Sequence, residues 1–205
     1  MPILFRRPQK DEVDVCIKLS ARLFDDAHKD TLHPDELAHL RSSDVWAKMW
    51  KNLLNVPPNS KRVHYLMAYA NETPVGYVVS CRNVFNHFPR QAGYLMALYV
   101  APEHQRRGIG RQLIESAFIH CEANIGNAMA VQVLQSDSSV RMIYESYGAD
   151  YRGSGESKGT IVNSKVDFLL FRDLRTTLID RFGIMPKRKS ILCKLDMWCK
   201  LHNLY

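Results

Sequence analysis

The sequence predicts an α+β fold, with a mixed, mostly antiparallel central sheet flanked by helices and a helical extension at the C-terminus. Two runs rich in β-forming residues, 63–70 and 74–81, stand at the spacing of an antiparallel hairpin. A third run, 94–100, is apolar throughout, as in a strand covered on both faces. It leads through a glycine-containing turn and a helical pattern to a fourth strand at 128–134. That order places one parallel crossover at the centre of the sheet, where ligands tend to bind.

The N-terminal part reads as a short strand followed by two helices. Residues 3–7 form the strand, and residues 11–24 repeat apolar side chains at helical intervals behind an acidic start. A second helix begins near Pro34 and carries its apolar side chains as far as Leu54. The prolines in 55–59 end it.

The second half alternates helices and strands. The expected elements are helix 109–121, strand 128–134, helix 138–147 ended by Gly148, strand 166–171 and helix 171–182 ended by Gly183. Between two of them, residues 152–165 hold three glycines and three serines and are predicted to be a mobile loop.

The composition is that of an ordinary globular chain of one domain with additions. Of its 205 residues, 46% are hydrophobic and 24% are charged, which excludes a disordered protein. The five cysteines are sparse and odd in number, which favours free thiols in a reducing compartment. The N-terminal residues lack a secretory pattern, and no apolar run reaches the roughly 18 residues of a membrane helix. We therefore expect a cytoplasmic protein.

The formal charge of +7 is concentrated at the C-terminus. Residues 1–60 carry nine basic and nine acidic residues, residues 61–171 carry eleven and nine, and residues 172–205 carry eight and three. We therefore divide the chain into a near-neutral domain, 1–171, and a basic helical extension, 172–205. The amphipathic pattern at 190–205 suits a membrane surface, nucleic acid, or packing on its own domain or on a second subunit of a homodimer, and packing is favoured.

Cysteine and histidine residues in the extension do not indicate a metal site. Cys193, Cys199 and His202 fall within ten residues, but their spacing matches no reliable zinc pattern. No metal is expected.

The turn at 105–111, Q-R-R-G-I-G-R, lies between a buried strand and an amphipathic helix. Glycines there let the backbone approach a ligand closely, and the N–H groups of a helix start suit phosphate oxygens. The alternative is a helix start with solvated arginines. A dinucleotide site is excluded, because the third glycine and the later acidic residue of that pattern are missing.

Two segments resemble the GCN5-related N-acetyltransferase (GNAT) superfamily. They are the stretch 98–114, with V-A-P-E-H before the turn, and the sequence Y-E-S-Y-G at 144–148. The superfamily signature is Q/R-x-x-G-x-G/A after V-x-P-E, with a later Y-E-x-x-G on a helix. The resemblance covers residues 1 to about 171 and implies acetyl-coenzyme A as cosubstrate. It implies a pyrophosphate on the backbone N–H groups of 106–111 and a pantetheine arm between strands 98–100 and 131–134. The implied cofactor-binding residues are Leu98, Tyr99, Val100, Gln105, Arg106, Arg107, Gly108, Ile109, Gly110 and Arg111.

Acetyl transfer to an amine needs a neutral amine, a donor to the developing oxyanion and a proton for the leaving thiolate. The resemblance implies a backbone N–H near Leu98 as the oxyanion donor. Tyr144 is the expected proton donor, with a core tyrosine as the alternative. Many relatives carry a carboxylate on the central strand where Met96 and Ala97 stand here, so a water relay or a residue outside the motif must act as base. Asp137 is expected to cap a helix rather than bind the cofactor.

Candidates on the acceptor side are less specific. Asp25, Asp26 and Asp30 could attract a cationic amine or form a solvated loop, and His87 is more typical of a surface residue than of a base. Three large side chains, Trp46, Met49 and Trp50, could line a pocket or belong to the core.

The expected function is N-acetylation of a primary amine, favoured as a small molecule, by direct attack in a ternary complex. The alternatives are acetylation of protein lysines, of protein N-termini or of aminoacyl-tRNA. A non-catalytic module that binds acyl-coenzyme A is the alternative outside enzymology.

Overall fold

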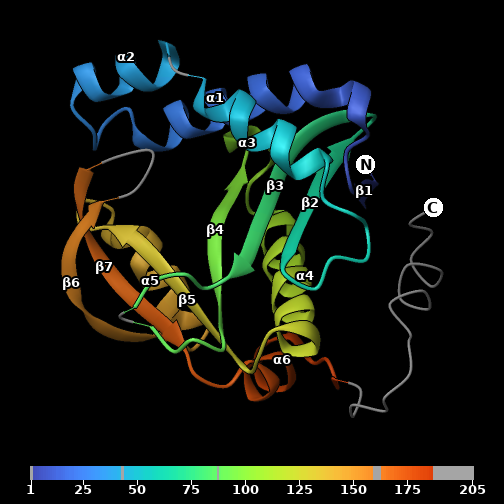
Figure 1. Cartoon of the computed structure of the whole chain (residues 1–205), viewed down its shortest axis with the longest axis vertical. Coiled ribbons are helices and arrows are strands. Elements are labelled where there is room, and N and C mark those ends of the chain that lie inside the picture. Colours follow the sequence, from blue (N-terminus) through green and yellow to red (C-terminus); the bar gives the residue numbers. More distant parts are fainter. Residues whose placement is uncertain (1, 43, 87, 159–162, 187–205) are drawn as a thin grey trace.

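The computed structural model describes residues 2–42, 44–86, 88–158 and 163–186 and contains one seven-stranded sheet (Figure 1). The strands are β1 (Ile3–Arg6), β2 (Val63–Ala70), β3 (Thr73–Arg82), β4 (Ala92–Val100), β5 (Ala128–Leu134), β6 (Asp150–Lys158) and β7 (Asn163–Phe171). Their order is β1-β2-β3-β4-β5-β7-β6, and the pairing is antiparallel except between β4 and β5. The α+β class and the central parallel crossover are confirmed.

Helices cover both faces of the sheet. They are α1 (Val13–His28), α2 (Pro34–Ser42), α3 (Val45–Leu54), α4 (Ile109–Asn124), α5 (Ser138–Ser146) and α6 (Leu174–Phe182), with short 3-10 turns at Lys10–Glu12 and Pro102–His104. Tyr99 of β4 contacts Phe24 of α1, whereas the next residue, Val100, faces Gly110 of α4. Because neighbouring strand residues point to opposite faces, α1 and α4 lie on opposite sides of the sheet. Among the described helices, none is long and apolar enough to cross a membrane.

The main core is aromatic and fully enclosed. Trp50 of α3 is 0% exposed, packs against Tyr77 of β3 and donates its indole N–H to Ser20 Oγ at 2.7 Å. On the other face, Phe118 of α4 meets Phe171 of β7 at 4.7 Å between ring centroids. Such rings contribute most of the apolar area that stabilises a core.

Helix α6 shares this core although it lies beyond residue 171. Leu174 and Leu178 are fully buried in the same cluster as the β-strands. Gly183 ends α6 in a left-handed conformation with φ of 71°, as its position predicts. The predicted amphipathic segment 190–205, with Cys193, Cys199 and His202, lies outside the described residues.

The extents of two predicted elements are wrong. The single helix predicted from Pro34 to Leu54 is two helices, because α2 ends at Ser42 and α3 begins at Val45, after Asp44 at its N-cap.

The loop predicted at 152–165 is also wrong, because most of it forms strands β6 and β7. Gly153, with φ of 124°, sits at a break in the strand register, and a Cβ on Gly155 would lie 2.9 Å from the Phe168 ring. Gly153 therefore allows a bulge, and Gly155 allows the Phe168 ring to pack close to the backbone. Composition alone does not distinguish glycines with these uses inside a strand from glycines in a loop.

Candidate active site

The sheet opens at its centre. Within the described chain, β4 and β5 pair only from Ala92 with Ala128 to Leu95 with Val131. Beyond these positions the two strands diverge, as Figure 1 shows for their C-terminal halves. We call the gap between residues 96–100 of β4 and 132–134 of β5 the wedge. Backbone groups on its two edges have no ladder partner across it, so they are available to an extended ligand.

A β-bulge marks the start of the wedge. The register between β3 and β4 shifts at the point where Val79 pairs with Ala97 and Ser80 pairs with Leu95, which leaves Met96 as the extra residue. Met96 is 42% exposed. The prediction that this apolar run is covered on both faces is therefore wrong at Met96.

The glycine turn leads from the end of β4 into α4. Gly108 is the N-cap of α4 with φ of 81°, a left-handed conformation that favours glycine, and a Cβ there would meet no described atom within 4 Å. The first helical bond runs from the N–H of Gln112 to the carbonyl of Gly108. The N–H groups of Ile109, Gly110 and Arg111 therefore have no acceptor within the helix and form a site suited to an anion.

Side chains around the turn show how it is held. Gln105 Nε2 donates to the Val100 carbonyl at 3.0 Å and ties the turn to the end of β4. Arg106, with φ of 61°, and Arg107 are exposed. Arg111 instead donates to the Arg181 carbonyl at 2.9 Å, in the last turn of α6. All three arginines are therefore exposed, but Arg111 also donates a hydrogen bond to α6.

Tyr144 occupies a buried position on α5. Its side chain is 7% exposed, and its ring stands edge-on to Phe171 at 6.4 Å between centroids. Burial, together with nearby Tyr94 and Asp137, raises its pKa, so the phenol keeps its proton at neutral pH. The expected capping role of Asp137 is confirmed, because its carboxylate accepts from the Val140 N–H at 3.1 Å. Tyr144 can thus donate a proton, and it also packs in the core.

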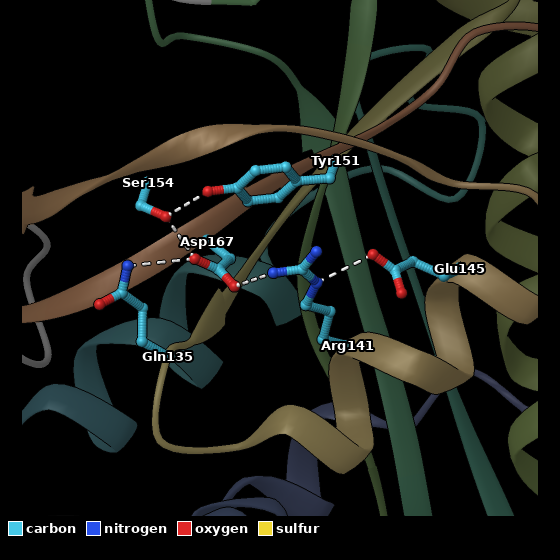
Figure 2. A network of polar contacts seen from close by, with 6 residues as sticks. All are labelled: Gln135, Arg141, Glu145, Tyr151, Ser154 and Asp167. Carbon is cyan, nitrogen blue, oxygen red and sulfur yellow. Dashed lines mark hydrogen bonds and ion pairs between the residues drawn. The ribbon is translucent and has the colours of Figure 1, made fainter.

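A polar network fixes α5 against β6 and β7 (Figure 2). Arg141 donates to Asp167 at 2.9 Å and to Glu145 at 2.8 Å. Burial disfavours the charge on Asp167, but hydrogen bonds from Ser154, Arg141 and Gln135 outweigh it and lower the pKa. No sequence motif predicts a role for these residues, and the only local signal is the i,i+4 spacing of Arg141 and Glu145.

A cavity of about 260 Å³ lies beside the C-terminal end of β5. Thr31 and Leu32, which follow α1, line one side, Leu134–Ser136 form the end of β5, and Ser164 and Lys165 of β7 complete it. Leu134 also lies on the β5 edge of the wedge, so the cavity and the wedge share a wall.

The acceptor-side candidates are scattered. Trp50 and Trp46 are buried, which supports the core interpretation for both. Asp26 and Asp30 are exposed, and Asp25 is half-buried. His87 lies outside the described residues. Among the residues that the structure describes, no three His, Cys, Asp or Glu side chains gather as a metal site would require.

Comparison with known proteins gives one family. The model of the acetyltransferase (GNAT) family matches residues 22–149. No curated protein sequence matches the chain.

Several solved structures share the fold. The PaiA N-acetyltransferase of Thermoplasma acidophilum, in complex with coenzyme A, has a TM-score of 0.63 at 16% identity over 82% of this chain and 98% of that one. YncA of Salmonella typhimurium, with its cofactor acetyl-CoA, has a TM-score of 0.58 at 15% identity, over 85% of this chain and 95% of that one. The ribosomal-protein-S18-alanine N-acetyltransferase of Escherichia coli has a TM-score of 0.57 at 13% identity, over 83% of this chain and 93% of that one.

Proposed function

This chain belongs to the GNAT acetyltransferase family, and from that premise we propose that it transfers the acetyl group of acetyl-coenzyme A to a primary amine of a small molecule. The observation that carries the proposal is the open wedge placed directly before the glycine turn. An elongated ligand with a phosphate group at one end and a reactive group at the other matches that arrangement.

The residues present fit such a cosubstrate. The free N–H groups of Ile109, Gly110 and Arg111 suit its pyrophosphate, and the absence of a side chain at Gly108 leaves room for close approach. The unpaired edges of β4 and β5 suit the amide groups of a pantetheine arm. When bound, acetyl-coenzyme A supplies a thioester, whose carbonyl carbon accepts an amine directly.

Two groups of this chain then assist the transfer in a ternary complex. A backbone N–H near Leu98, on the wedge half of β4, donates to the oxygen that becomes negative during attack. Tyr144 donates its phenolic proton to the departing thiolate, because the buried phenol is protonated throughout the working pH range. The polar network around Arg141 and Asp167 keeps α5, and with it Tyr144, in place.

The small-molecule preference is supported by the size of the cavity at the end of β5, which suits a compact acceptor. The exposed Asp26 and Asp30 near the end of α1 would attract a cationic amine. A cytoplasmic location belongs to the same proposal, since Cys16, Cys81 and Cys121 are all free thiols.

The test is a thiol-release assay with acetyl-coenzyme A and a panel of small amines, lysine peptides, N-terminal peptides and aminoacyl-tRNA. We expect turnover with at least one small amine and weak dependence on salt. Turnover only with aminoacyl-tRNA, falling steeply with ionic strength, would overturn the small-molecule assignment. Cosubstrate binding without turnover on any acceptor would favour the non-catalytic module.

A further inference from the structure

A histidine and a tyrosine meet on the α1 side of the wedge. His28 is the last residue of α1, and its Nε2 lies 3.2 Å from the hydroxyl of Tyr99 on β4. The imidazole packs against the Phe24 ring at 4.4 Å and stands edge-on to the Tyr99 ring at 6.1 Å. The pair therefore connects a helix on one face of the sheet with the wedge half of the central strand.

The position of the pair separates it from Tyr144. Tyr99 faces α1, whereas its neighbour Val100 faces α4. Tyr144 lies on the α4 side, because its ring stands against Phe171, which in turn meets Phe118 of α4. A ligand in the wedge would thus have Tyr144 on one face and Tyr99 on the other. An acid for the leaving group and a base for the attacking group need that separation, because attack and departure occur on different sides of the carbonyl carbon.

His28 also anchors the rim of the cavity. Its carbonyl accepts from the N–H groups of Thr31 and Leu32, at 3.0 and 2.9 Å, and from the Thr31 hydroxyl at 3.2 Å. Thr31 and Leu32 are the residues of this turn that line the 260 Å³ cavity. The backbone of His28 therefore holds the turn that forms one side of the cavity.

The protonation states suit a base and a relay. Burial lowers the pKa of His28, partly opposed by the Asp137 carboxylate, so the imidazole is neutral at neutral pH. Burial raises the pKa of Tyr99, so the phenol is protonated and can donate to Nε2. His28 Nδ1 is buried and has no hydrogen-bond partner in the described chain. Tyr99 and Asp137 are the ionisable groups that act on the ring, and Asp137 stabilises the imidazolium once it forms.

We propose that His28 is the general base of the acetyl transfer, acting through the Tyr99 hydroxyl. This inference rests on the proposed function. The acceptor reacts as the neutral amine, after its ammonium proton has passed to solvent. As the amine nitrogen bonds to the acetyl carbonyl carbon, one N–H proton passes to the Tyr99 oxygen while the Tyr99 proton passes to His28 Nε2. The C–S bond then breaks, and its electron pair takes the proton of Tyr144. The imidazolium loses its proton to solvent and the Tyr144 phenolate regains one, so the net products are the amide and the free thiol.

The experiment compares wild type with His28→Gln and Tyr99→Phe, the latter keeping the ring and removing only the hydroxyl. We expect kcat to fall about 10²–10⁴-fold in both variants, with acetyl-coenzyme A affinity changed by less than about twofold. The exposed His33, which follows this turn, provides the control His33→Gln, which should keep wild-type kcat.

The pH profile separates catalysis from structure. With saturating amine, wild-type kcat should be level from about pH 7 to 9 and fall on the acid side, where the imidazole is charged. In His28→Gln, kcat should climb continuously over that range, because the N–H proton of the attacking amine must then pass to hydroxide from solvent. A variant with the wild-type profile and rate would overturn the base assignment.

Folding and function failures are distinguishable. If the melting temperature of His28→Gln is well below that of wild type, the test rests on Tyr99→Phe. A wild-type kcat in Tyr99→Phe would then contradict the proton relay. If wild type itself releases no thiol with any amine, the proposed function fails and the base assignment fails with it.

Discussion

Acidification should destabilise this protein, and the largest effect should come from the half-buried His64 of β2. Its ring stacks on His120 of α4 at 5.0 Å between centroids, and its Nε2 is 3.1 Å from Ser116 Oγ. Burial, then the neighbouring His120, then the cationic Arg7 lower the pKa of His64 to about 3. The folded protein therefore holds His64 neutral at pH values where the unfolded chain binds a proton.

The sign follows from linkage. The folded pKa of His64 lies below the unfolded value of about 6.5. The contribution of neutral His64 to the free energy of unfolding is therefore fully present above pH 6.5 and is lost as the pH falls toward 3. At pH 5.0 the unfolded His64 is about 1.5 pH units below its pKa and is protonated, whereas the folded His64 stays neutral. At about 1.36 kcal/mol per unit, acidification from pH 7.5 to 5.0 lowers the free energy of unfolding by about 2 kcal/mol through His64 alone. Burial also lowers the pKa values of His28 and His120, so they add to the loss.

The assay is urea unfolding of wild type and His64→Phe at both pH values. Phenylalanine keeps the stacked ring, and Ser116 Oγ still donates to the Leu113 carbonyl at 2.7 Å. The variant should lose about 2 kcal/mol less than wild type on acidification. Equal acid losses in wild type and His64→Phe would refute the reasoning.

Three further predictions follow from the site and the strands around it. Tyr144→Phe should lower kcat about 10²-fold or more and leave acetyl-coenzyme A affinity nearly unchanged, and an unaltered kcat in the thiol-release assay would remove Tyr144 from the mechanism. Asp167→Asn should lower the free energy of unfolding by about 2 kcal/mol in urea, because Arg141 loses its buried partner, and a wild-type midpoint would show the network to be marginal. Gly155→Ala should cost about 1–2 kcal/mol, because the new methyl would meet the Phe168 ring at 2.9 Å, and an unchanged melting temperature would contradict that contact.

Local patterns in the sequence were sufficient for the glycine turn and its helix. The apolar run of β4, the left-handed glycine at 108 and the helical period of α4 are adjacent in the chain, so each limits the others. The Asp137 cap and the Gly183 helix end were predictable for the same reason, since a cap depends on a few neighbouring residues.

Features set by distant parts of the chain were not predictable from such patterns. The pairing of β4 with β5 stops after Leu95, which depends on strand register and leaves no mark on composition. His28 and Tyr99 are 71 residues apart, and Arg141 and Asp167 are 26 apart, and only the folded sheet brings each pair together. The glycines of β6 resemble loop residues in the sequence, because the packing of the Phe168 ring against Gly155 exists only in the folded sheet.

The central claim is that the turn before α4 holds the phosphates of acetyl-coenzyme A, and titration calorimetry tests it most directly. Gly108→Glu places a carboxylate at the anion site, Gly108→Gln adds the same bulk without charge, and Gly153→Glu changes another open, positive-φ glycine away from the turn. We predict that wild type and Gly153→Glu bind alike, that Gly108→Glu weakens binding about tenfold or more, and that Gly108→Gln falls between them. Absence of binding in wild type, or equal affinity in all four proteins, would contradict the account.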